Sequence, residues 1–135
     1  MEQKLAHLQM IQGVINRMAG NSFLIKGWSV TLIAALFALA AGKTNSLFVY
    51  IAYFPAIAFW VLDAYFLRQE RLFRMLYDHV RDRSEPEIDF SMNTAQFSNS
   101  VDSQFKVAFS ETLLVFHGTI MATIIIVMIV LALKI

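Results

Sequence analysis

The feature that most constrains this chain is its last apolar stretch, residues 112–133. It contains no Asp, Glu, Lys or Arg in 22 residues. Because an α-helix rises ~1.5 Å per residue, roughly 20 residues are enough to cross the hydrocarbon core of a bilayer. One small soluble core could not bury so long a run. The sequence therefore predicts a membrane-spanning helix here.

Two further stretches of similar length come earlier in the chain. Residues 22–42 are interrupted only by Lys26, and residues 47–67 contain Pro55 and Asp63. The polar break at residues 43–46 is short enough for a tight helical hairpin. A composition of 58% hydrophobic and 16% charged residues is that of a membrane protein rather than a soluble domain. The predicted fold class is all-α: a helical integral membrane protein with three transmembrane helices in one domain.

The segments outside the three spans have separate predictions. Residues 1–19 carry apolar side chains at helical spacing and predict an amphipathic helix, which lies on the membrane or packs on another subunit or on its own chain. Residues 68–83 predict a cytoplasmic helix that extends from the second span. Residues 84–103 are rich in Ser and Asn and contain Pro86, which predicts a long polar loop.

Orientation follows from the positions of the basic residues. Only Lys43 and Lys134 lie on the side of the first hairpin turn and the C-terminus, whereas nine of the 11 Lys and Arg lie on the opposite side. The positive-inside rule then places the N-terminus and the middle segment in the cytoplasm and the C-terminus outside.

The two charges inside the spans are predicted to pair. Lys26 lies sixteen residues before Gly42, and Asp63 lies sixteen residues after Leu47. In an antiparallel hairpin both therefore lie ~24 Å from the outer turn. Pairing relieves the cost of each charge near the membrane. A lock on the hairpin's register is the favoured role, and an ion path or gate is the alternative.

Three small residues of the first span, Ala34, Ala38 and Gly42, share one helical face. Such a face lets helix backbones approach closely in lipid. It is expected to meet the second span or another subunit. His117 in the third span is expected to be a buried polar residue. A proton-sensing role is less favoured because no second titratable group is near it in sequence.

The segments after the second span offer candidate contact residues. Arg and aromatic side chains are frequent anchors of interfaces, so the extended helix is a candidate subunit contact. Apolar residues in the polar loop are candidates for docking a protein trigger, or else they pin the loop to its own helices. The helix candidates are Glu70, Arg71, Phe73, Arg74 and Tyr77, and the loop candidates are Phe90, Met92 and Phe97.

Catalytic signatures are not found in the sequence. It contains no phosphate-binding loop, dinucleotide fingerprint, zinc-protease motif or hydrolase elbow, and its three histidines are dispersed. We therefore expect no enzyme activity, catalytic residue, metal or cofactor. A net charge of +1 argues against a nucleic-acid partner, and the absence of Cys excludes disulfides.

Several motifs stand out along the first two spans and the helix that follows: Asn16-Arg17-Met18-Ala19, Asn21-Ser22-Phe23, Lys26-Gly27-Trp28, Phe59-Trp60-x-Leu62-Asp63-Ala64-Tyr65 and Leu67-x-x-Glu70-x-x-Phe73-Arg74-x-Leu76-Tyr77. Together they resemble one family of short bacterial membrane proteins, the RipA-like octameric membrane proteins. The resemblance covers roughly residues 16–80 and does not extend to the polar loop or the third span. It implies a homo-oligomeric ring in the bacterial inner membrane and a place in anti-phage defence.

Two classes of function follow from these expectations. One is a homo-oligomeric pore-forming or membrane-disrupting effector, with membrane lipid and its own copies as partners. The other is a structural or accessory inner-membrane protein that binds a partner and has no permeation path. A transporter is less favoured because the two charges are predicted near one face rather than at the midplane. A phage holin is less favoured still because of the long middle segment.

Overall fold

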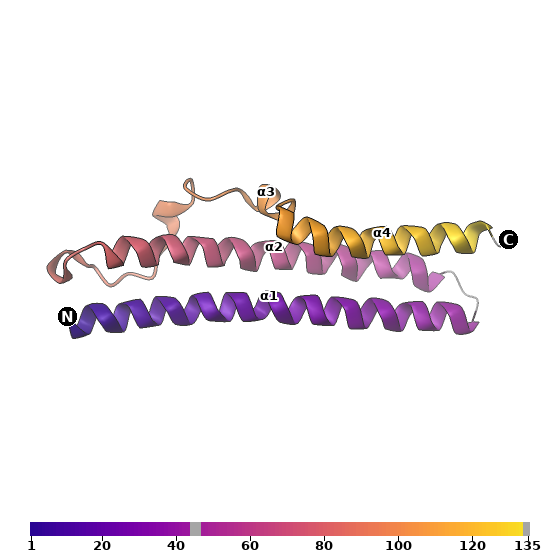
Figure 1. The fold of residues 1–135 in the computed structure, drawn as a ribbon, viewed down its shortest axis with the longest axis horizontal. Coiled ribbons are helices and arrows are strands. Elements are labelled where there is room, and N and C mark those ends of the chain that lie inside the picture. The colour runs from indigo at the N-terminus through magenta and orange to yellow at the C-terminus, as the bar shows by residue number, and fades with distance from the viewer. Residues whose placement is uncertain (44–46, 134–135) are drawn as a thin grey trace.

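Three long helices dominate the computed structural model, which describes residues 1–43 and 47–133 (Figure 1). Helix α1 (Glu2–Lys43) and helix α2 (Leu47–Arg81) form an antiparallel hairpin, and α4 (Glu111–Leu133) packs on α2. Between α2 and α4 lie two 3₁₀ turns, Glu85–Glu87 and Ala95–Phe97, and the short helix α3 (Gln104–Ala108). The predicted hairpin turn at residues 44–46 falls outside the described residues.

All three long helices are apolar enough to cross a membrane, which confirms the prediction of three such segments. At ~1.5 Å per residue, α1 is about 63 Å long and α2 about 52 Å, whereas the hydrocarbon core is ~30 Å thick. Helix α4, at about 35 Å, matches the core closely. Helices α1 and α2 are therefore long enough to extend past a bilayer at the end where the N-terminus lies.

Helix α1 differs from the sequence expectation. The segment 1–19 is not a separate amphipathic helix but the first half of a continuous helix of 42 residues. Residues 1–43 contain no Pro, and a glycine inside a helix costs only ~1 kcal/mol relative to alanine. Gly20, at the expected boundary, lies in open space and does not interrupt the helix. Helix α2 likewise continues past residue 67 without a break.

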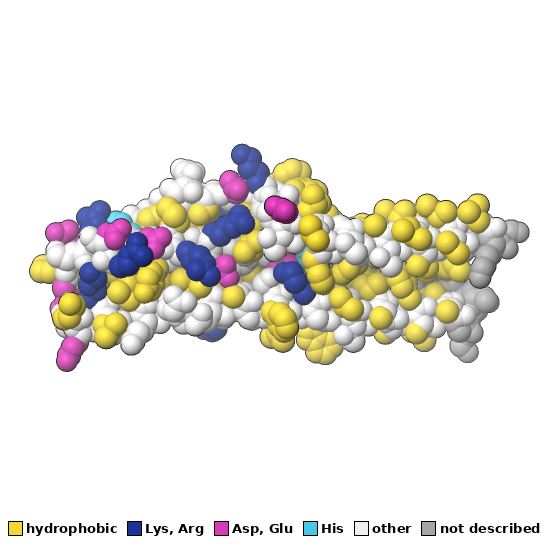
Figure 2. All heavy atoms as spheres, in the orientation of Figure 1, with side chains coloured by type: hydrophobic (Ala, Val, Ile, Leu, Met, Phe, Trp, Pro, Cys, Tyr) yellow, Lys and Arg dark blue, Asp and Glu magenta, His cyan; other side chains and the backbone are white. Residues whose placement is uncertain are grey.

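The surface divides the molecule into two halves (Figure 2). The apolar half consists of α1 from residue 22, α2 up to residue 67, and α4. The charged half consists of α1 up to residue 21, α2 from residue 68, and the segment 82–110. Figure 2 shows hydrophobic side chains over most of the apolar half, and the charged side chains gathered on the other.

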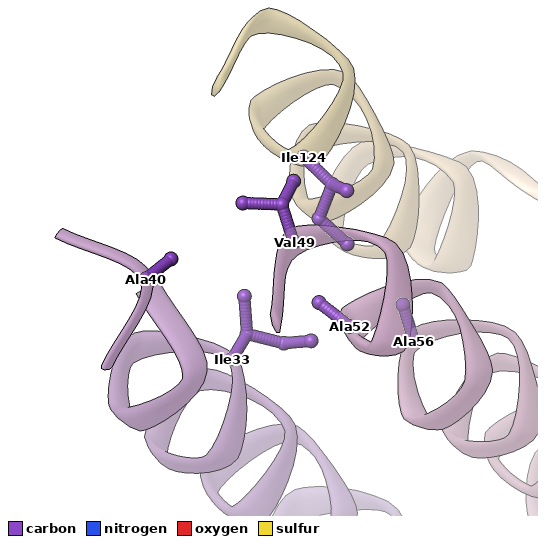
Figure 3. Close-up of a cluster of buried hydrophobic side chains, with 6 residues drawn as sticks. All are labelled: Ile33, Ala40, Val49, Ala52, Ala56 and Ile124. Carbon is purple, nitrogen blue, oxygen red and sulfur yellow. The ribbon is translucent and has the colours of Figure 1, made fainter. Parts of the chain in front are cut away.

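Each half has its own hydrophobic core. In the apolar half, α2 lies between α1 and α4, and its Ala52 and Ala56 let both neighbours approach (Figure 3). In the charged half, α1 and α2 meet in a second cluster, here called the seam. The seam consists of Ile11, Ile15, Leu76 and Val80.

Candidate functional site

Asp63 lies at the centre of a buried cluster of polar side chains where the two halves meet. Its side chain is 0% exposed. The Lys26 ammonium Nζ lies 2.5 Å from Asp63 Oδ2, and His117 Nε2 lies 2.7 Å from the same oxygen. The Ser22 hydroxyl donates to Asp63 Oδ1. These four residues, the charge cluster, bring together α1, α2 and α4.

The chain places these residues at one level by simple helical counting. Lys26 lies seventeen residues before the end of α1, Asp63 sixteen after the start of α2, and His117 sixteen before the end of α4. At ~1.5 Å per residue these separations are about 24–26 Å. The cluster therefore lies near one edge of the ~30 Å hydrocarbon core that the three helices can span.

The cluster satisfies a charge that would otherwise be costly to bury. A lone carboxylate in an apolar interior costs several kcal/mol or more. Here both oxygens of Asp63 accept hydrogen bonds, and the lysine ammonium neutralises the charge. Lys26 also donates to Ser22 Oγ at 2.8 Å, and its side chain remains 23% exposed, so its ammonium reaches toward the polar side.

His117 connects the charge cluster, through Trp60, to the junction between α3 and α4. Its ring is stacked on Trp60 with centroids 5.8 Å apart and planes 8° apart, and the Trp60 indole donates to the carbonyl of Ala108 at 2.7 Å. Because His117 Nε2 faces a carboxylate, we assign the ring proton to that nitrogen. The other ring nitrogen is buried and has no partner among the described residues.

Sequence reasoning predicted the contact of Lys26 with Asp63 but missed His117. No titratable group is near His117 in sequence, but Asp63 lies against it at a sequence separation of 54 residues, so the reason given against a proton-sensing role does not hold. Sequence separation is a poor guide to distance between packed helices. The depth count that aligned Lys26 with Asp63 would also have aligned His117, counted back from the end of the third span.

The small-residue face of α1 is turned away from α2. Ala34 and Ala38 are exposed, whereas Ile33 and Ala40 on the opposite face are buried against α2. Of the two alternatives, packing against the second span is therefore not observed at Ala34 and Ala38. The surroundings of Gly42, the third residue of this face, lie outside the described residues.

The candidate contact residues on the extended part of α2 have partners within the chain. Phe73 and Tyr77 pack partly buried against the seam. Arg74 Nε lies 3.4 Å from Glu70 Oε2, and Arg71 Nη1 lies 4.0 Å from Asp102 Oδ2. Exposed pairs of this kind contribute ~1 kcal/mol or less.

The polar loop folds back over the seam. Met92 and Phe97 pack against it, so these two residues pin the loop to its own helices. Phe90 is 42% exposed, has a positive φ of 57°, and lies against the His7 ring with centroids 5.4 Å apart. His7 Nε2 is 3.1 Å from the carbonyl of Ser91. Of the three docking candidates, Phe90 presents the most surface.

Comparisons of the chain with protein-family models, with curated proteins and with solved structures gave no match.

Proposed function

We propose that this protein is a homo-oligomeric membrane protein whose assembled subunits breach the bilayer, as a pore-forming or membrane-disrupting effector in bacterial anti-phage defence. The observation that carries the proposal is the uncovered small-residue face of α1. Ala34 and Ala38 are exposed in a helix whose Ile33 and Ala40, on another face, are buried against α2. Helices in lipid associate through small residues that allow close backbone contact.

The resemblance to the RipA-like octameric membrane proteins supports the same proposal. Its motifs include three of the four residues of the charge cluster, Ser22, Lys26 and Asp63. They also include Trp60, which stacks on His117 of the cluster, and Leu76, which belongs to the seam. Part of the resemblance thus falls on residues that make contacts within the subunit, and an octamer is the assembly that the resemblance implies.

The proposed setting is the bacterial inner membrane. Nine of the 11 basic residues lie on the side of the charged half, which the positive-inside rule assigns to the cytoplasm. The N-terminus and the polar loop are then cytoplasmic and the C-terminus is outside. In this orientation the polar loop, with Phe90 on its surface, is where a protein trigger would bind.

The alternative is a structural or accessory protein that binds a partner without opening a path. The closed charge cluster favours it, because Asp63 is 0% exposed and both of its carboxylate oxygens accept hydrogen bonds within the cluster. Any lumen must therefore form between subunits rather than through one subunit.

The test begins with native mass spectrometry of the detergent-extracted protein. A ring of about eight subunits supports the proposal, and a monomer or dimer contradicts it. Dye release from proteoliposomes, with the trigger or at high protein density, then separates effector from accessory protein. The diagnostic variant is Ala34→Leu with Ala38→Leu, which should dissolve the oligomer and abolish release. Its control, Ile126→Leu on the exposed face of α4, should change neither.

A further inference from the structure

Two phenylalanines stand exposed on the short helix that precedes α4. Phe105 is 74% exposed and Phe109 is 50% exposed, and their ring centroids are 4.9 Å apart. With Lys106 between them they line a shallow depression on the surface. Since α4 begins two residues after Phe109 and its apolar run begins at residue 112, this depression lies at the edge of the apolar half. We therefore expect the depression to lie at the membrane interface rather than in bulk water.

The backbone that carries the two rings is fixed in place. The Trp60 indole donates to the carbonyl of Ala108 at 2.7 Å, and the Gln104 amide donates to the carbonyl of Val61 at 3.1 Å. The Ser103 hydroxyl caps the helix by accepting from the Lys106 amide at 3.3 Å. The depression is thus preformed, and a ligand would not have to order it.

The charge beside the rings is positive and uncompensated. Within residues 1–43 and 47–133, no carboxylate forms an ion pair with the Lys106 ammonium. Arg68, which holds the segment before α3, donates to the carbonyls of Ser98 and Asp102 rather than to a carboxylate. The Asp102 carboxylate faces Arg71 instead, at 4.0 Å. Lys106 is therefore a cation within α3 that has no carboxylate partner among these residues, whereas the Arg68 guanidinium is already engaged by backbone carbonyls.

From this arrangement we infer that α3 forms an interfacial site for an anionic phospholipid. The upper part of an acyl chain lies against Phe105 and Phe109, and the phosphate lies at the Lys106 ammonium. Two aromatic rings beside a cation offer the two contacts that a phospholipid at the membrane interface needs, apolar contact for the acyl chain and a positive charge for the phosphate. Cationic residues at that level attract anionic lipid. This inference does not depend on pore formation or on the number of subunits.

The chain contains a reporter for this site. It has two tryptophans, and Trp60 lies below Phe109 with ring centroids 5.5 Å apart. In a Trp28→Phe background, Trp60 is the only tryptophan. The full chain is reconstituted in two matched bilayers of phosphatidylcholine and phosphatidylglycerol. In one bilayer only the glycerol lipid is brominated near the top of its acyl chains, and in the other only the choline lipid is brominated, at the same mole fraction.

The expected result is stronger quenching of Trp60 by brominated phosphatidylglycerol. The preference should be about fivefold, the ratio that ~1 kcal/mol per cationic residue gives. Lys106→Gln should reduce the preference to about one, whereas Arg83→Gln, which removes the same charge far from α3, should leave it unchanged. Phe105→Ala should weaken quenching by both lipids. Equal quenching in the parent protein, or a preference that survives Lys106→Gln, would overturn the inference.

Discussion

The two halves of this molecule use the same two helices in opposite ways. In the apolar half, α1 and α2 turn hydrophobic side chains outward around an apolar core, and the charge cluster around Asp63 lies at the edge of this half. In the charged half, they turn charged side chains outward and enclose the apolar seam. The reversal happens without a break in either helix. A continuous helix therefore says nothing about whether its surroundings are lipid or water, and the side-chain pattern must be read turn by turn.

The largest effect should come from removing the central charge of the apolar half. Asp63→Leu leaves the Lys26 ammonium partly buried beside no carboxylate, which should cost about 4 kcal/mol of unfolding free energy. The double variant Lys26→Met with Asp63→Leu should recover most of the loss, because two apolar side chains can replace a buried pair. Reversible unfolding in mixed micelles measures both. Additive effects of the two substitutions would show that the residues are not coupled.

A slightly smaller effect should come from the core of the charged half. Ile15 is 2% exposed in the seam, so Ile15→Ala should cost about 3 kcal/mol through lost burial and the cavity left behind. The control is Leu5→Ala on the same helix, where the side chain is 56% exposed and the expected change is within about 0.5 kcal/mol. Equal losses at the two positions would mean that the seam is not a core.

Removing the third helix from the charge cluster should have a more moderate effect. His117→Phe keeps an aromatic ring against Trp60 but removes the hydrogen bond to Asp63. A hydrogen bond to a charged group is worth about 2 kcal/mol, and this is the expected loss. The loss should disappear in the Asp63→Leu background, where no carboxylate remains to be satisfied. An unchanged loss in that background would show that the effect of His117 does not arise from its hydrogen bond to Asp63.

The smallest effect is expected at the end of the charged half where the N-terminus contacts Glu85. A hydrogen bond from the Met1 ammonium holds the pKa of the Glu85 carboxyl below its usual range. The stabilisation is thus fully present above the usual pKa of glutamate and is lost as pH falls through the lowered pKa. Carboxyl NMR titration should place the pKa of Glu85 below the usual range, and acetylation of the N-terminus should raise it toward that range, because the Lys4 amide still donates to the carboxylate. A titration unaffected by acetylation would contradict the contact.

Much of this fold could be predicted because lipid imposes strong rules on sequence. Apolar runs of about 20 residues with at most one charge have few alternatives to a spanning helix, so the three long helices were predictable. The contact of Lys26 with Asp63 was predictable because a tight hairpin turns residue counts into depth. The boundary expected near Gly20 is not observed because helix ends need a stop signal, and a change from polar to apolar residues is not one.

Two parts of the site could not be predicted in the same way. Counting back from the end of α4 gives the depth of His117, but the sequence does not show which face of α4 packs on α2, and the contact with Asp63 depends on that face. The sequence of the polar loop identified its apolar residues, but it did not indicate whether they pack on the same chain or bind a partner. Met92 and Phe97 turn inward to the seam, while Phe90 stays partly exposed, and only the fold of the loop distinguishes them.

The most direct test of the change from charged to hydrophobic outer surface between the two halves is a cysteine scan along α1. The chain contains no Cys, so each introduced thiol is the only one that can be labelled. Single cysteines at exposed positions before and after Lys26 are tested in proteoliposomes with a membrane-impermeant maleimide applied to both faces. Gln12→Cys and Arg17→Cys should react at the rate of a free thiol, and Leu32→Cys and Leu39→Cys should not react. Rapid labelling at Leu32 or Leu39, or protection that begins well before Lys26, would contradict the account.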